Sequence, residues 1–419
     1  MAAYPRGTGG DAGTLAHAPP LRRAVRTIPL VSGRHLLLAG CGHAHMDLLA
    51  ALGRGIPAGW RVTLVTPQPD FHYSGMLPAI IAGLEEPGAA DIPVARIAAA
   101  AGIEVTRASV TALDAGARSV TLHDGRTLDC DLLSLDVGSI VAAGRLPGVR
   151  EHAIAVRPFA LALTLLSRLD AHAAAGGRGA ELHVVIVGGG AAGVEVALAV
   201  RARLASAGCH PQVTIVSAAS DDGLPLAGFA LRQRRRALRA LADRGIRVMA
   251  AEVTAVESDA VCVIPAASEL QERLRSDTTV WVTGAAAHPW LASSGLRCDS
   301  RGFPLAAPTL ALNTDATIFG AGDTVTLCDA PHTAKAGVYA VRMAPVLAAN
   351  VLAVMTGAVP RRHYTPQAGY LALLSTGDGR ALLNWRGLSL ESAWAQRLKS
   401  WIDERYLTRQ RALLRSAGA

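Results

Sequence analysis

Lysine, closely spaced cysteines and long apolar runs are nearly absent from this sequence of 419 residues. Lysine occurs only at Lys335 and Lys399, so arginine supplies almost all of the 41 basic residues. No apolar run reaches the length of about 18 residues that a membrane-spanning helix needs. The best candidate, residues 343–359, is interrupted by Pro345 and Gly357. We therefore expect no transmembrane helix.

The cysteines are isolated from one another in the sequence. No two of them have the spacing of a metal-binding knuckle or of a redox-active disulfide. This pattern is typical of a reducing compartment, so we expect a cytoplasmic protein without a metal site. The six residues are Cys41, Cys130, Cys209, Cys262, Cys298 and Cys328.

Charge and hydrophobicity indicate a folded protein of two or three domains. Hydrophobic residues make up 51% and charged residues 18%, which allows a large core. The net charge of +8 is spread out, so we expect no nucleic-acid partner. Residues 1–32 carry four arginines and one acid but no apolar core of a secretory signal. They form a flexible extension, a targeting peptide or a wrongly assigned start, and we favour the extension.

Two βαβ units follow from the pattern of apolar runs and glycines. Residues 35–39 predict a strand, GCGHAH at 40–45 a turn, 46–52 a helix and 61–65 a second strand. The pattern recurs at 182–216, where GGGAAG at 188–193 separates a strand from a helix. Each unit has the length of a mononucleotide-binding unit, so the chain predicts two dinucleotide sites.

The second turn satisfies the GxGxxG pattern directly between a strand and a helix. Gly188 permits the tight turn, Gly190 lets the backbone approach a pyrophosphate, and Gly193 lets the helix pack on the strand. In the first turn His45 stands where the third glycine is expected. His43 and His45 are either metal ligands or residues lining a phosphate turn. We favour the second alternative, because no set of cysteines or carboxylates accompanies them.

Neither unit ends its second strand with the acid that binds a ribose hydroxyl, since Thr66 and Ser217 stand there. The choice between NAD and NADP is therefore open. Arg232 and the arginines at 234–236 could hold a 2′-phosphate, but we favour a solvated helix face because leucines recur among them.

Further elements are expected between and after the two units. Residues 104–113 alternate as one strand, and 119–128 form a hairpin. Short strands lead to Gly138, to Gly284 and to the Gly-Ala-Gly-Asp sequence at 320–323. A long helix is expected over 334–354, kinked at Pro345.

The order of these motifs resembles a known superfamily. The two glycine turns, LSLDVGS at 133–139, VWVTGA at 280–285 and TIFGAGD at 317–323 are similar to the two-dinucleotide-binding-domain flavoproteins, the pyridine nucleotide-disulfide oxidoreductases. The resemblance implies an α/β fold with two Rossmann-like domains, the NAD(P)H domain being inserted in the FAD domain. The expected organisation is an extension at 1–32, an FAD-binding domain at 33–150 and 290–355, an NAD(P)H-binding domain at 151–289, and a C-terminal segment at 356–419.

The resemblance also implies which residues bind the cofactors FAD and NAD(P)H. FAD would lie on Gly40, Gly42 and Asp323, with Val110 near the adenine. NAD(P)H would lie on Gly188, Gly190 and Gly193. We also expect cofactor contacts from His43, Ala44, His45, Thr66, Gly138, Ala191, Ala192, Gly284 and Gly322.

A closer resemblance rests on GCGHAH, on YSGMLP at 73–78 and on KAGVYAVR at 335–342. These segments are similar to a subgroup related to type II NADH dehydrogenases that is often fused ahead of a selenide, water dikinase. In that subgroup the third glycine is regularly histidine. No dikinase domain is expected within these 419 residues, and only family context suggests a selenium role. Without a cysteine pair, the resemblance implies hydride transfer to FAD and then direct electron transfer to an acceptor, with a quinone favoured.

Two residues are candidates for a catalytic role. Glu195 follows the second turn, and the resemblance places it near the nicotinamide side of the flavin; alternatively it is an acid that suits the first turn of a helix. Lys335, near a helix start, would stabilise negative charge on the reduced flavin. Alternatively it is a surface lysine.

The tail from residue 391 to 415 is expected to form an amphipathic helix. Its apolar residues are Trp394, Leu398, Trp401, Ile402 and Tyr406. The helix would lie on the inner face of a membrane, or dock on the protein's own core or on the second subunit of a homodimer.

Three functions therefore compete. The first is an NAD(P)H:quinone oxidoreductase. The second is a sulfide- or selenide-handling flavoprotein, for which Cys328 is the best thiol candidate. The third is a flavin-bound redox partner in selenium metabolism.

Overall fold

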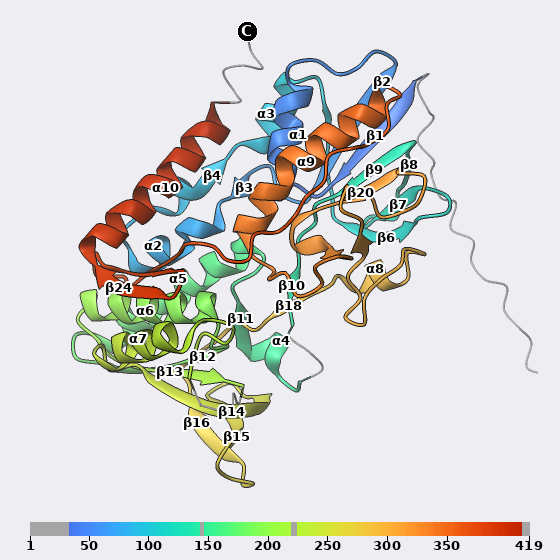
Figure 1. The fold of residues 1–419 in the computed structure, drawn as a ribbon. Coiled ribbons are helices and arrows are strands. Elements are labelled where there is room, and N and C mark those ends of the chain that lie inside the picture. Colours follow the sequence, from blue (N-terminus) through green and yellow to red (C-terminus); the bar gives the residue numbers. More distant parts are fainter. Residues whose placement is uncertain (1–32, 143–145, 219–223, 413–419) are drawn as a thin grey trace, which may run out of the picture.

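The computed structural model describes residues 33–142, 146–218 and 224–412. The predicted extension 1–32 lies outside these ranges. Two sheets form the upper right and lower left of Figure 1, the first parallel and the second parallel except for its last two strand pairs, which are antiparallel. The family resemblance predicted an α/β fold of this kind, and the two sheets confirm it.

The first sheet has five parallel strands in the order β20-β9-β1-β2-β5. Its strands are β1 (Arg34–Ala39), β2 (Trp60–Thr66), β5 (Glu104–Arg107), β9 (Leu132–Leu135) and β20 (Ile318–Gly320). The middle strands are almost continuous apolar runs, as in a sheet whose two faces are both buried. β20 comes from far along the chain, so the second sheet lies in sequence between strands of the first.

Helix α9 packs beside α1 on this sheet (Figure 1). The helices near the sheet are α1 (His45–Leu52), α3 (Val94–Ala100) and α9 (Gly337–Met355), whereas α2 (Leu77–Ala82) packs against α6 (Ala191–Ser206) of the second unit. α9 continues through Pro345 as one helix. Among the described residues it alone is long and apolar enough to cross a membrane, but half of its apolar window is buried in the protein. Its buried Asn350 bonds the carbonyls of Thr309 and Arg362, as in a core helix.

The second sheet has seven strands in the order β11-β17-β12-β13-β14-β15-β16. They are β11 (Ala153–Ala155), β12 (Glu181–Val187), β13 (His210–Ser217), β14 (Arg247–Val256), β15 (Ala260–Pro265), β16 (Glu272–Arg275) and β17 (Thr278–Trp281). Its helices are α4 (Val149–His152), α5 (Phe159–Gly176), α6 (Ala191–Ser206) and α7 (Leu231–Ala242). α7 buries Gln233, Ala237 and Leu241 and exposes Arg232 and Arg235, as expected for a solvated helix face.

The expected single strand at 104–113 is wrong. The chain turns at Ala108, whose N–H is bonded to the carbonyl of Thr66, and the two halves join different sheets. β5 stays in the first sheet, while β6 (Val110–Asp114) pairs with β7 (Ser119–Leu122), and β7 pairs with β8 (Thr127–Asp129). Alternation alone does not distinguish one strand from two that share a corner.

Short two-stranded pairs connect these layers. They are β3 (Phe71–His72) with β4 (Asp91–Ile92), β10 (Ile140–Val141) with β18 (Ala285–Ala286), and β19 (Leu305–Ala306) with β21 (Thr326–Leu327). Short helical segments are η1 (Ser74–Met76), η2 (Pro87–Ala90), η3 (Gly322–Thr324) and α8 (Pro289–Ala292).

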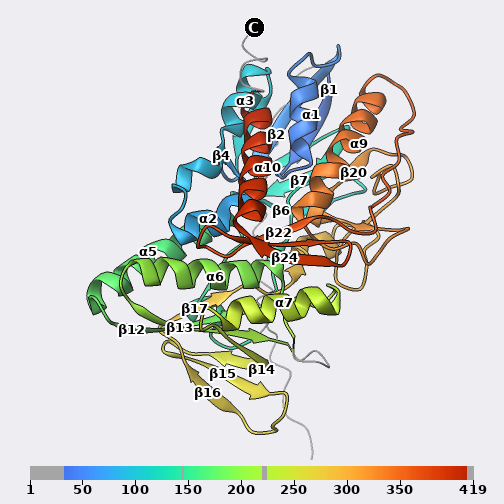
Figure 2. The same cartoon turned by 60° about the vertical axis from the view of Figure 1, so that its left-hand side comes forward.

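The C-terminal segment is an antiparallel sheet followed by a long helix. β22 (Ala372–Ser375), β23 (Ala381–Trp385) and β24 (Leu388–Ser392) lead into α10 (Ala393–Arg411), which begins with the Ser392 side chain as its cap. α10 runs beside α2 and β4 in both views (Figures 1 and 2). One face of α10 is therefore packed on the protein's own core, while Trp394 and Trp401 are each 56% exposed.

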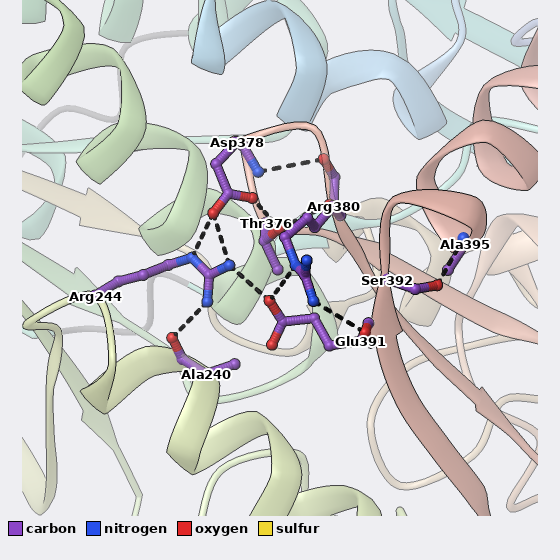
Figure 3. Close-up of polar contacts among 10 residues, drawn as sticks. Ala240, Arg244, Thr376, Asp378, Arg380, Glu391, Ser392 and Ala395 are labelled. Atoms are coloured by element: carbon purple, nitrogen blue, oxygen red, sulfur yellow. Dashed lines mark hydrogen bonds and ion pairs between the residues drawn. The ribbon is translucent and has the colours of Figure 1, made fainter.

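An ion-pair network fixes this C-terminal sheet to the second unit (Figure 3). Arg244, just after α7, donates to Asp378 at 3.0 and 2.7 Å and to Glu391 at 2.7 Å. Arg380 also donates to Glu391. The side chains of Arg244 and Glu391 are only 17% and 13% exposed, so the bond between them is shielded from water. The network ties the end of α7 to the β22–β23 turn, through Asp378, and to β24, through Glu391.

We expect Arg244→Ala to lower the free energy of unfolding by about 1–3 kcal/mol, because Asp378 and Glu391 lose charge-assisted hydrogen bonds. Arg273→Ala is the matched control, since Arg273 pairs with Glu257 and Asp259 on an exposed strand. Chemical denaturation of both variants checks this. Equal loss in the two variants would contradict a role for Arg244 in holding the C-terminal segment.

Candidate dinucleotide-binding sites

The first glycine turn joins β1 to α1 at the carboxyl end of the first sheet. The Gly40 N–H is bonded to the Val65 carbonyl at 2.8 Å, and its φ of +81° suits glycine. A Cβ at Gly40 would meet the backbone carbonyl of Asp136 at 2.5 Å. A Cβ at Gly42 would meet the Asp136 carboxylate at the same distance. Both glycines are therefore required by the close approach of Asp136, which directly follows β9.

His45 replaces the third glycine without blocking the turn. Its ring is fully buried beneath the turn, with Nδ1 2.7 Å from the Gly40 carbonyl and Nε2 2.8 Å from the Ser134 hydroxyl. Burial lowers the pKa of His45 to about 4, so the ring is neutral. A neutral ring that donates from Nδ1 and accepts at Nε2 satisfies both contacts. His45 thus fills the space between helix and strand with its side chain.

His43 points elsewhere, which argues against a metal site formed by the two rings. It contacts the edge of Phe71 at 4.8 Å and lies 5.8 Å from Tyr73 and 5.9 Å from Tyr406, measured between ring centroids. Burial lowers its pKa to about 4 as well. No group of three or more metal-ligating side chains occurs in the part of the chain that the structure describes.

Asp136 is a site residue that the sequence analysis did not select. Asp136 is 3% exposed, and its carboxylate accepts the backbone N–H of His45 at 2.8 Å beside the Ala44 amide, while its backbone carbonyl accepts the Gly42 N–H at 3.1 Å. Burial raises its pKa to about 7, against the effect of these bonds. The available signal was an acid at the end of an apolar strand, within LSLDVGS.

The Gly-Asp motif meets the same edge of the sheet. Asp323, in η3, accepts Arg157 Nη1 at 3.0 Å and the Ser139 hydroxyl at 3.2 Å. The Gly138 N–H is bonded to the Thr324 hydroxyl at 2.9 Å. The structure thus brings the predicted residues Gly138, Gly322 and Asp323 together with the first turn, and adds Arg157 and Ser139, which the sequence analysis missed.

Thr66 and Val110 lie at the end of β2 and the start of β6, on the β2 side of the first turn. Thr66 ends β2, and its buried hydroxyl donates to the Gln68 carbonyl at 3.1 Å. Val110 begins β6, two residues after the backbone bond between Ala108 and Thr66.

The second glycine turn repeats the first at the edge of the second sheet. The Gly188 N–H is bonded to the Val216 carbonyl at 2.8 Å, as the Gly40 N–H is to Val65. A Cβ at Gly193 would lie 1.8 Å from the Gly188 carbonyl oxygen. Because this is a clash with the backbone, no rearrangement of a side chain could remove it. A Cβ at Gly190 would meet nothing within 4 Å. The backbone at Gly190 therefore faces open space at the start of α6, as a pyrophosphate site requires.

The other residues predicted for this site lie on two different segments, the start of α6 and the segment after β17. Ala191 and Ala192 form the first turn of α6, with Ala192 exposed. Gly284 follows β17, and its carbonyl accepts the Ala142 N–H.

Glu195 lies in a buried charged cluster where three segments meet. Its carboxylate accepts the Ser375 N–H at 2.8 Å and interacts with Lys399 and Asp403 of α10. Lys399 donates to Asp403 at 2.9 Å and to the Gly75 carbonyl at 2.7 Å. Burial raises the pKa of Glu195 to about 7, while Lys399 opposes the shift. This cluster could hold or transfer a proton near neutral pH.

α10 connects that cluster to the first turn. Asp403 accepts the Tyr73 hydroxyl at 2.9 Å, and Tyr73 stacks on Tyr406 at 4.6 Å. Lys399, Asp403 and the two tyrosines were not selected from the sequence, because their meeting depends on a helix more than 300 residues from Tyr73.

Lys335 lies under the Gly-Asp segment. Its ammonium group donates to the Val325 carbonyl and lies 3.9 Å from the centre of the Phe303 ring. Burial lowers the pKa of Lys335 to about 8, while Asp323 opposes the shift. Lys335 is thus not a plain surface lysine. These contacts hold the 322–326 segment, and a charge effect on the flavin stays a prediction.

All six cysteines lie among the described residues, and each is a free thiol. Cys130 is buried and donates to the Arg118 carbonyl, whereas Cys328 is exposed. Burial raises the pKa of Cys41. The chain therefore carries no disulfide in this structure.

Comparisons with known proteins agree with this architecture. Among curated proteins, the NADH dehydrogenase-like protein Rv1812c of Mycobacterium tuberculosis is 31% identical over 273 residues, covering 62% of each chain. The demethylphylloquinone reductase NdbB of Synechocystis is 27% identical over 309 residues, covering 71% of this chain and 72% of the relative. The chain thus matches less than two thirds of the length of the mycobacterial relative.

Solved structures show the same fold at low identity. The sulfide:quinone oxidoreductase of Aquifex aeolicus has a TM-score of 0.74 at 18% identity, covering 91% of this chain and 92% of that one. NDH2 of Plasmodium falciparum has a TM-score of 0.71 at 12% identity, covering 92% and 97%.

The family profile described as pyridine nucleotide-disulphide oxidoreductase matches residues 34–344. That match confirms the resemblance predicted from the motifs and supports FAD and NAD(P)H as cofactors, while the link to selenide, water dikinase stays a prediction. On this evidence the chain belongs to the pyridine nucleotide-disulphide oxidoreductase family.

Proposed function

We propose that this protein is an FAD-dependent NAD(P)H oxidoreductase that passes electrons directly to a small acceptor, with a quinone favoured. The observation that carries the proposal is the pair of matched glycine turns, each at the carboxyl ends of parallel strands in its own sheet, in a chain whose six cysteines are all free. Two dinucleotides without a disulfide relay leave the flavin itself as the electron donor to the acceptor.

The residues of each turn divide the work of binding. Gly40, Gly42, Gly138 and Asp323 would hold FAD, which supplies hydride acceptance and electron transfer when bound. The residues at 188–193 would hold the pyrophosphate of NAD(P)H at the start of α6. Arg157 would orient Asp323 through their ion pair. The domain boundaries given by the motifs are part of this proposal.

The C-terminal surface supports a quinone acceptor. On α10, Arg405 lies over the exposed ring of Trp401 at 5.4 Å; Arg386 lies over Trp385 at 5.1 Å in the β23–β24 hairpin. Exposed tryptophans beside arginines are typical of surfaces that lie at a membrane interface, where long-chain quinones dissolve. The curated relative NdbB is named a demethylphylloquinone reductase. We infer peripheral attachment of a cytoplasmic protein to the inner face of a membrane.

A second candidate is a sulfide- or selenide-handling flavoprotein. The exposed thiol of Cys328, five residues beyond Asp323, is the observation that favours it. A thiol route needs an accessible thiolate, which burial denies to Cys41 and Cys130. Retention of quinone turnover in Cys328→Ser would favour the first function, and loss of sulfide-driven flavin reduction in that variant would favour the second.

The test of the proposal begins with the visible flavin bands of the purified protein. Anaerobic NADH and NADPH should bleach these bands, and a quinone should restore them. Turnover is then compared with quinone, oxygen and selenite as acceptors. A colourless protein, or a flavin that neither nucleotide reduces, would contradict the proposed function.

Gly190→Val should fold normally and retain FAD, because its side chain enters open space without touching the protein. It should lose reduction by NAD(P)H, because that space is where the pyrophosphate would lie. Gly193→Val is the contrasting variant, since its Cβ would overlap the Gly188 carbonyl and prevent the turn from closing. Flavin content and anaerobic reduction rate measure the first outcome, and circular dichroism the second. If Gly190→Val loses FAD and keeps normal NAD(P)H reduction on reconstitution, the two sites are assigned in reverse.

Trp394→Ser combined with Trp401→Ser should lower activity toward long-chain quinones in vesicles and spare water-soluble acceptors. Both side chains are exposed, so the fold should be unaffected. Sedimentation with vesicles that contain anionic lipids measures binding directly. Trp281→Phe, at a buried position, serves as a control for general loss of tryptophan. Unchanged vesicle binding in the double variant would place the membrane contact elsewhere.

Glu195→Gln should remove a pH-dependent step in acceptor turnover. The pKa of Glu195 is raised to about 7, so the group is protonated below that pH and ionised above it. A raised carboxyl pKa also means that its contribution to stability is present at low pH and is lost as pH rises through about 7. When the pH is raised from about 5 to about 8, the thermal stability of Glu195→Gln should therefore fall less than that of the parent protein. If the parent protein and Glu195→Gln have the same pH profile of turnover and the same pH profile of thermal stability, Glu195 does not titrate in this range.

A further inference from the structure

The carboxylate of Asp136 occupies the inner side of the first glycine turn, where the helix amides point. It accepts the His45 N–H at 2.8 Å and lies beside the Ala44 amide, while the Gly42 N–H is bonded to the backbone carbonyl of Asp136 at 3.1 Å. A Cβ placed on Gly42 would lie 2.5 Å from Asp136 Oδ1. These amides belong to the start of α1, which is the part of the turn that a dinucleotide pyrophosphate requires.

The second turn of the same chain has no such acid. Asp136 N–H is bonded to the last residue of β1 at 2.9 Å, and Val282 N–H is bonded to the last residue of β12 at 2.8 Å. Each of these two residues also presents its carbonyl to the first glycine of its turn. Asp136 and Val282 therefore hold equivalent positions, and the acid is a property of the first turn alone.

No cation neutralises Asp136 among residues 33–142, 146–218 and 224–412. The titratable groups that face it are Cys41 of the turn, Asp323 of η3 and Tyr406 of α10. Arg157 is paired with Asp323, and Lys335 is bonded to the Val325 carbonyl. The amides of the turn are thus the main groups that stabilise an ionised Asp136.

A pyrophosphate bound at this turn would face that carboxylate at close range. Two anions at one buried position disfavour each other, and the weaker acid responds by taking up a proton. A protonated carboxyl resolves the conflict, because one oxygen still accepts an amide N–H while the O–H donates to a phosphate oxygen. Burial already raises the pKa of Asp136 to about 7, so this proton is available near neutrality.

We propose that Asp136 binds the FAD pyrophosphate as a neutral carboxylic acid, so that cofactor binding takes up one proton. The proposal rests on FAD being the occupant of the first turn, as in the proposed function. The apoprotein would then bind FAD only in the form in which Asp136 is protonated. Val282, the counterpart of Asp136, leaves the NAD(P)H turn without this dependence.

The test is the affinity of the apoprotein for FAD between about pH 6 and about pH 9, measured by quenching of flavin fluorescence. Affinity of the parent protein should fall about tenfold per pH unit above about 7. Asp136→Asn keeps the shape and supplies an N–H in place of the O–H, so its affinity should be nearly independent of pH. Asp47→Asn is the matched control, because Asp47 lies in the first turn of α1 but pairs with Arg409. It should retain the slope.

A measurement on the parent protein alone guards against a variant that does not fold. The infrared difference spectrum between FAD-bound protein and apoprotein above pH 7 should contain a protonated carboxyl band. Absence of that band, an affinity independent of pH in the parent, or the same slope in Asp136→Asn would overturn the proposal. A protein that binds no FAD at any pH would instead contradict the proposed function.

Discussion

The fold depends on how closely a helix can begin against the end of a parallel strand. Both units place this contact at a glycine turn, where the first glycine donates to the neighbouring strand on one side and meets the carbonyl of a residue that follows the neighbouring strand on the other side. In the second turn the helix starts so close that a Cβ at Gly193 would overlap the Gly188 carbonyl. In the first turn the His45 ring is bonded to the Gly40 carbonyl and Ser134, so a large side chain satisfies the same constraint. One chain thus contains two solutions of one packing problem.

The C-terminal segment joins the two units at their common side. Arg244 fixes the antiparallel sheet to α7, and α10 then runs back to α1 through the pair between Arg409 and Asp47 (Figures 1 and 3). Between these ends, Lys399 and Asp403 bring charge into the core beside Glu195. Burial of a lysine is favourable only where carboxylates and carbonyls surround it, so this helix face specifies its own docking position. The opposite face carries the exposed tryptophans.

Most of the fold could be predicted from the sequence because its signals are local. Glycine spacing and apolar strands located both units, and the order of motifs indicated the superfamily that the comparisons confirmed. The errors arose where a local pattern has two three-dimensional outcomes, as at the corner near Ala108. The alternatives for α10 also stayed open, because spacing does not reveal that Lys399 rather than Trp401 faces the core. Asp136 was missed for a related reason: the glycine pattern describes the turn, whereas the acid reaches it from a strand about ninety residues later.

Two buried carboxyl groups lie near the starts of the two helices that would face the dinucleotides. Asp136 contacts the amides of α1 directly, whereas Glu195 lies within the first turns of α6 and faces away to Ser375 and Lys399. Burial raises the pKa of both to about 7, yet the physical surroundings differ. Amide dipoles surround one acid and a cation faces the other. Burial opposes ionisation of Glu195 and Lys399 offsets only part of this effect, so ionisation weakens the docking of α10, while ionisation of Asp136 fills the turn with negative charge. The same shift in acidity therefore bears on binding at the first site and on docking of the C-terminal helix at the second.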